Sequence, residues 1–94
     1  MITNTHLQSY YTDKTKKNTV MIVSAIFSPS SFETFDCQLT MQKKFSSSKW
    51  EMEDICIFNI NRNRYESIYS LYSYILLDQL LNEVLEEITL DIGA

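Results

Sequence analysis

The sequence predicts an α+β fold in which a three-stranded antiparallel sheet is followed by one long C-terminal helix packed on it, a βββα order. Near the C-terminus, apolar residues recur at gaps of three and four, which is typical of one face of an α-helix. Upstream, runs of β-branched and apolar residues are separated by serine-rich stretches and the single proline, which is typical of strands joined by turns.

The predicted helix runs from Asn63 to about Leu90. Asn63 suits the N-cap because its side-chain oxygen can accept a hydrogen bond from a free backbone N–H, and Glu66 can reach back as in a capping box. β-Branched residues and a glycine weaken the helix near its other end. The apolar stripe of this helix comprises Tyr74, Leu77, Leu81, Val84 and Ile88.

The three expected strands occupy the middle of the chain. Thr19–Phe27 is apolar on both faces, which favours a central strand. Residues 35–42 alternate between apolar and polar, as in an antiparallel strand with one solvated face, and Trp50–Ile60 is expected to return beside them. Residues 1–18 are predicted to be a polar arm or an edge strand, and the whole chain, residues 1–94, to be a single domain.

The register of the second hairpin bears on the cysteines. A turn in the serine-rich loop after Met41 would place Met41 opposite Met52 and Cys37 opposite Cys56, although a bulge could shift the register by one residue. Because the sequence shows no export signal, we expect reduced thiols rather than a disulfide, and a cytoplasmic protein.

We expect no catalytic site, no metal site and no cofactor. His6 is the single histidine and lies in the polar arm, so a serine or cysteine nucleophile would have no firmly positioned base. The two cysteines lack the spacing of zinc ligands, and the single glycine, Gly93, leaves no glycine-rich phosphate loop. The sequence therefore predicts that the protein is not an enzyme.

Charge is unevenly distributed along the chain. The net charge is −4, yet all eight Lys and Arg residues lie at or before Arg64. Carboxylates near a helix C-terminus oppose the helix dipole, so they do not stabilise the helix. They either increase solubility or bind a basic surface of a protein partner. Tyrosines at the start of the helix offer contact area at low entropic cost, or they cover the sheet. The predicted partner-binding residues are Tyr65, Tyr69, Tyr72, Glu83, Glu86, Glu87 and Asp91.

These features favour a small acidic protein-binding module without catalytic activity. The composition is rich in Phe, Tyr, Ile, Asn and Lys and poor in Gly and Arg, which is typical of AT-rich genes. We expect an inhibitor, immunity or anti-defence protein of a phage or mobile element, with anti-CRISPR proteins among the candidates. No membrane partner is expected.

The alternative is a chaperone-like or structural homodimer. A helix of roughly 38 Å would extend past strands of about 30 Å, so part of its apolar stripe would need a dimer mate. We therefore expect the chain to form a homodimer, and the predicted self-association residues are Tyr74, Leu77, Leu81, Val84 and Ile88.

A nucleic-acid-binding βββα domain is a remote alternative. Strands followed by a C-terminal helix resemble the double-stranded-RNA-binding domain, which implies contacts between phosphates and the start of that helix. Here Arg62 and Arg64 precede Glu66, whose carboxylate would repel phosphate at that position. The remaining basic residues fall in separate runs, so nucleic acid is not an expected partner.

Overall fold

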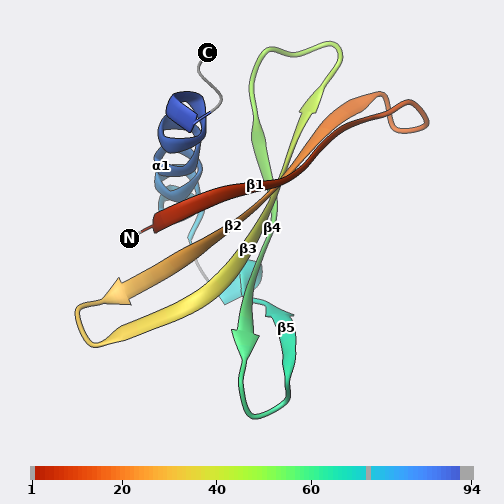
Figure 1. The fold of residues 1–94 in the computed structure, drawn as a ribbon. Helices are drawn as coiled ribbons and strands as arrows, with labels where there is room; N and C mark the ends of the chain where they lie inside the picture. The colour runs from red at the N-terminus through yellow and green to blue at the C-terminus, as the bar shows by residue number, and fades with distance from the viewer. Residues whose placement is uncertain (1, 72, 92–94) are drawn as a thin grey trace.

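The computed structural model describes residues 2–71 and 73–91, and the side chains of residues 74 and 89–91 are outside this description. An antiparallel sheet of five strands has the order β1-β2-β3-β4-β5, so neighbours in sequence are also neighbours in the sheet. The strands are β1 (Ile2–Asp13), β2 (Asn18–Ser30), β3 (Glu33–Lys44), β4 (Glu51–Asn59) and β5 (Arg64–Ser67). A short 3-10 helix, η1 (Tyr69–Leu71), leads into α1 (Tyr74–Asp91), which lies to one side of the sheet (Figure 1).

The α+β class is confirmed, but the prediction of three strands is wrong. The two additional strands, β1 and β5, form the edges of the sheet. The register between β1 and β2 shifts after Thr3 and again after Leu7, and at each shift β1 has an extra residue relative to β2. Such bulges break the two-residue alternation by which a strand is recognised in a sequence, and Asn4 in the first bulge has a positive φ of 52°.

The predicted helix start at Asn63 is also wrong. Asn63 lies in the turn between β4 and β5 with a φ of 53°, and the next four residues form β5. There Tyr65 pairs with Phe58 and Ser67 with Cys56. Pairing satisfies backbone groups of β4 that would otherwise lie at an unprotected edge, so tertiary pairing outweighs the local helical pattern.

The helix is capped by Ser73 instead. The Ser73 hydroxyl accepts a hydrogen bond from the backbone N–H of Leu76 at 3.4 Å, and its carbonyl accepts from the N–H of Leu77 at 3.1 Å. Serine is a preferred N-cap because its oxygen satisfies one of the free N–H groups of the first turn. The predicted long helix is therefore replaced by a strand, a 3-10 helix and a shorter α-helix, β5, η1 and α1.

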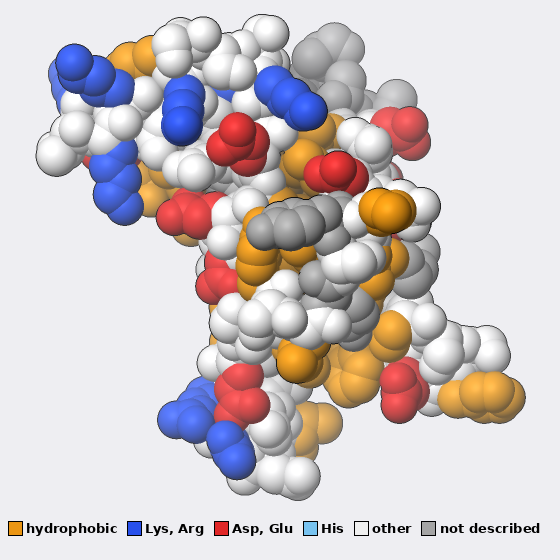
Figure 2. All heavy atoms as spheres, turned by 180° about the vertical axis from the view of Figure 1, so that it is seen from behind, with side chains coloured by type: hydrophobic (Ala, Val, Ile, Leu, Met, Phe, Trp, Pro, Cys, Tyr) orange, Lys and Arg blue, Asp and Glu red, His pale blue; other side chains and the backbone are white. Residues whose placement is uncertain are grey.

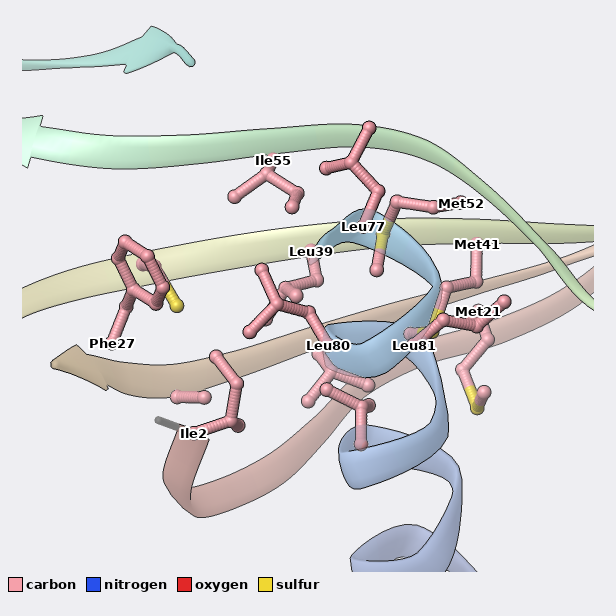
Figure 3. Packing of buried hydrophobic residues seen from close by; sticks show 14 of the residues in the cluster. Ile2, Met21, Phe27, Leu39, Met41, Met52, Ile55, Leu77, Leu80 and Leu81 are labelled. Atoms are coloured by element: carbon pink, nitrogen blue, oxygen red, sulfur yellow. The ribbon is translucent and has the colours of Figure 1, made fainter. Parts of the chain in front are cut away.

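The helix packs its apolar stripe on one face of the sheet. In Figure 3, Leu77, Leu80 and Leu81 point toward side chains of the sheet, including Leu39 and Ile55. The helix has 18 residues and β2 has 13, which correspond to about 27 Å and about 43 Å. The helix is therefore shorter and the strands are longer than predicted, and the stripe residues Leu77, Leu81, Val84 and Ile88 are buried within one chain.

The register between β3 and β4 separates the two cysteines. Met41 pairs with Met52 as predicted, but the register then shifts by one residue, so Cys37 pairs with Ile57. The predicted pairing of Cys37 with Cys56 is wrong. Because successive side chains of a strand point to opposite faces, Cys37 is buried on the helix side while Cys56 is half-buried on the other side.

The sheet curls around the core at one end. The rings of Tyr10 in β1 and Trp50, directly before β4, meet edge to face with centroids 6.2 Å apart. These positions are separated by β2 and β3, so in a flat sheet they would be about 14 Å apart. The contact therefore requires strong twist and coiling, which are seen as the steep crossing of the strands in Figure 1.

Candidate interaction surface

The face of the sheet away from α1, which we call the open face, is not covered by any element among the described residues. From Met21 to Phe27 in β2, side chains that are buried on the helix side alternate with side chains that are half-buried, as the face pattern of a strand requires. The open face comprises Gln8, Ile22, Ser24, Ile26, Gln38, Cys56, Phe58 and Tyr65.

Tyr65 is an exposed aromatic side chain of the open face. Its ring is 46% exposed and meets the Phe58 ring edge to face, with centroids 5.2 Å apart. Tyr65 borders two hollows of about 330 Å³ and about 270 Å³. A rigid ring of this kind provides apolar contact area together with a hydroxyl that can form a hydrogen bond at the rim of an interface.

The two hollows differ in the groups that line them. The first is lined by hydrogen-bonding side chains of three strands, Gln8, Ser24 and Gln38, together with Ile22. Gln8 reaches this face at the second bulge of β1, and its amide Nε2 donates to Ser24 Oγ at 2.8 Å. The second hollow is lined by Asn4, His6, Ile26 and Asp36 among others. The open face therefore combines apolar contacts with donors and acceptors that can orient a partner.

A carboxylate network borders this face between β4 and β5. Asp54 accepts hydrogen bonds from Ser67 Oγ at 2.6 Å and from Cys56 Sγ at 3.3 Å. Burial, followed by the hydrogen bond to Asp54, raises the pKa of Cys56 to about 11. Burial raises the pKa of Cys37 to about 12. A thiol with a raised pKa carries little thiolate at neutral pH, so neither cysteine has the environment of an activated nucleophile.

Glu66, predicted to be part of a helix cap, stabilises the β4–β5 hairpin instead. Its carboxylate accepts hydrogen bonds from Asn59 Nδ2 at 3.3 Å, Arg64 Nε at 3.2 Å and Arg62 Nη1 at 3.1 Å. These contacts, with that of Asn59 the largest, lower the pKa of Glu66. Both arginines of the chain are therefore engaged with a carboxylate of the same hairpin.

The predicted partner-binding residues are distributed over different parts of the fold. Tyr65 lies on the open face, whereas Tyr69 is half-buried and packs against the core. Glu86 is exposed on α1, and Glu83 and Glu87 are half-buried. Tyr72 and the side chain of Asp91 lie outside the described residues.

The predicted self-association residues lie mainly in the core of one chain. Leu77, Leu81, Val84 and Ile88 are at most 6% exposed and pack on the sheet, and the side chain of Tyr74 lies outside the described residues. Of the open face, only Tyr65 was among the predicted site residues. The alternation of Gln38 with Cys37 and Leu39 is the sequence signal for a second, solvated face.

Glu87, on α1, forms a hydrogen bond with the first strand, and its contribution to stability can be tested. Thr5 is 5% exposed, and its hydroxyl donates to Glu87 Oε2 at 2.6 Å, joining β1 to α1. We expect Thr5→Val to lower the free energy of unfolding by about 1.5–3 kcal/mol, since it removes a hydrogen bond to a charged group while keeping the shape of the side chain. Urea denaturation measures this change. Thr3→Val, at an exposed position of the same strand, is the control, and an equal loss in both variants would contradict the assignment.

No protein-family model matches the chain, and searches of curated proteins and of solved structures find no significant match. Within residues 2–71 and 73–91, no group of three or more His, Cys, Asp or Glu side chains is arranged to hold a metal ion. In the same part of the chain, no helix has the length and apolar character needed to cross a membrane.

Proposed function

We propose that the chain is a small protein-binding module without catalytic activity, and that it binds its partner through the open face of the sheet. The observation that supports this is the exposed Tyr65 ring, held against Phe58 between two hollows. Tyrosine is enriched among the residues that dominate protein interfaces, particularly where it is surrounded by side chains that exclude water. The half-buried Ile22 and Ile26 are suited to that surrounding role.

The hydrogen-bonding groups of the open face favour a folded protein surface as the partner. Side chains from four strands, including Gln8, Gln38 and Tyr65, are distributed over this face rather than gathered in one deep cavity. Interfaces of this kind combine an apolar centre with polar groups at the rim. Within this class we propose an inhibitor, immunity or anti-defence role of the anti-CRISPR kind, which the small size and the AT-rich composition support.

Replacing Tyr65 tests the proposal. Tagged wild-type protein and Tyr65→Ala are used to capture proteins from cells that carry the gene, and the affinity for the purified partner is then measured by calorimetry. We expect Tyr65→Ala to weaken binding roughly thirtyfold, as for an interface residue worth about 2 kcal/mol.

Tyr10→Ala is the matched control. Tyr10 is 56% exposed but lies on the helix side of the sheet, paired with Met21. Circular dichroism shows whether each variant is folded. Undiminished binding by folded Tyr65→Ala, or equal losses in both variants, would contradict the proposal. If light scattering shows a dimer that Tyr65→Ala dissociates, a homodimer through the open face is favoured instead.

A further inference from the structure

All six lysines of the chain gather at one end of the sheet, which we call the lysine end. Three lie in or beside the β1–β2 turn (Lys14, Lys16 and Lys17), and three lie at the β3–β4 connection (Lys43, Lys44 and Lys49). The two groups are adjacent because Asn18 pairs with Lys44 and the N–H of Phe45 donates to the Lys17 carbonyl at 3.0 Å. Figure 2 shows the blue side chains over this end, and a separate pair at the β4–β5 hairpin.

Carboxylates balance only part of this charge. Glu51 and Glu53 are exposed on β4, and Asp78 borders a hollow with Lys49. Asp13 is half-buried and accepts hydrogen bonds from the backbone N–H groups of Thr15 and Lys16, at 3.1 Å each. The lysine end is therefore locally positive although the whole chain has a net charge of −4.

Aromatic rings lie among the lysines. Tyr10 and Phe45 are each 56% exposed and Tyr11 is 48% exposed. Trp50, the single tryptophan, contacts the Tyr10 ring and has Lys43 Nζ 5.2 Å from its ring centroid. Exposed rings beside flexible cationic side chains can stack with flat groups while the cations contact negative charges.

We infer that the lysine end binds single-stranded nucleic acid. Lysines neutralise phosphates, and unpaired bases stack on exposed aromatic side chains, which together give binding with little sequence preference. An acidic protein is the competing occupant, but the Lys43 ammonium held over the Trp50 ring, with Phe45 and Tyr11 exposed nearby, places cations next to flat rings as in sites that contact phosphates and stack bases. In the sequence the basic runs are separated, and the β2–β3 pairing brings two of them together.

The fluorescence of Trp50 and the anisotropy of labelled oligothymidine and oligouridine test this inference on the full chain. We expect quenching of Trp50 and binding that weakens steeply with salt, because each neutralised phosphate releases counterions. In the variant with Lys16→Gln and Lys44→Gln, the slope of log affinity against log salt should fall by about 1.4, at about 0.7 for each lost phosphate contact.

The matched control removes the same charge elsewhere. Arg62→Gln with Arg64→Gln neutralises two positive groups at the opposite end of the sheet, and its salt slope should be that of the wild type. Phe45→Ala should weaken binding about fivefold or more if bases stack on that ring. Circular dichroism verifies that all variants are folded.

Three results would overturn the inference. The first is absence of binding to either oligonucleotide at low salt, and the second is equal loss in the lysine and arginine variants. The third is binding to polyglutamate as tight as to the oligonucleotides and unaffected by Phe45→Ala, which would assign the lysine end to an acidic protein. None of these results depends on Tyr65 or the open face, so this inference and the proposed function can fail separately.

Discussion

Leu80→Ala is expected to lower the free energy of unfolding by about 2–5 kcal/mol. Leu80 is 0% exposed and lies on the side of α1 that packs against the sheet. Truncating the Leu80 side chain removes apolar contacts and leaves a cavity between the helix and the sheet. Neither element can move far enough to fill this cavity completely. Urea denaturation of both proteins, with unchanged m-values, measures the difference.

Leu71→Ala is the control for this prediction. Leu71 lies in η1, close to the helix in sequence, but it is 75% exposed. The same leucine-to-alanine substitution at this exposed position should therefore alter the free energy of unfolding by no more than about 0.5 kcal/mol. Similar losses for the two variants would contradict the packing of α1 on the sheet.

The two thiols are expected to react far more slowly in the folded protein than in the unfolded one. The raised pKa values, about 12 for Cys37 and about 11 for Cys56, compare with an ordinary value of 9.0. At pH 8 the thiolate fraction should thus be lower by roughly a thousandfold for Cys37 and roughly a hundredfold for Cys56. Reaction with a chromogenic disulfide, with and without denaturant, should show two thiols that react slowly in the folded protein and rapidly on unfolding.

Cys56→Ala identifies the faster of the two reactions. Because Cys56 is half-buried and Cys37 is 1% exposed, the variant should lose the faster phase and keep the slower one. The sign of the pH dependence follows from the same shifts. The unfolded chain loses thiol protons near pH 9 while the folded chain retains them, so stability should fall as the pH rises from 9 toward 12. Rapid reaction of both native thiols at pH 8 would contradict this assignment.

Local periodicity predicted those elements whose pattern is uninterrupted. The stripe from Leu77 to Ile88 forms the buried side of α1, because spacings of three and four place side chains on one face whatever lies opposite. The pairing of Met41 with Met52 was likewise predictable, because it depends only on the hairpin that joins β3 and β4.

The candidate site was predictable only in part. Tyr65 was expected to contact a partner from a helix. It lies on an exposed surface, but in strand β5 and beside Phe58. Phe58, Gln8 and Gln38 were not expected at a site. Their common surface exists because five strands pair in order and one face receives the helix, which no single segment determines.

The sequence by itself determined the α+β class, the apolar side of α1 and the position of the central hairpins. Tertiary structure alone decided that Arg64–Ser67 pairs with β4 instead of starting the helix, because strand pairing satisfies an exposed backbone edge. It also decided that Cys37 and Cys56 face opposite sides, since a one-residue bulge exchanges the faces of every residue beyond it. The meeting of two lysine runs depends on the length and register of the β2–β3 hairpin, which continues beyond the predicted strands and places Asn18 opposite Lys44.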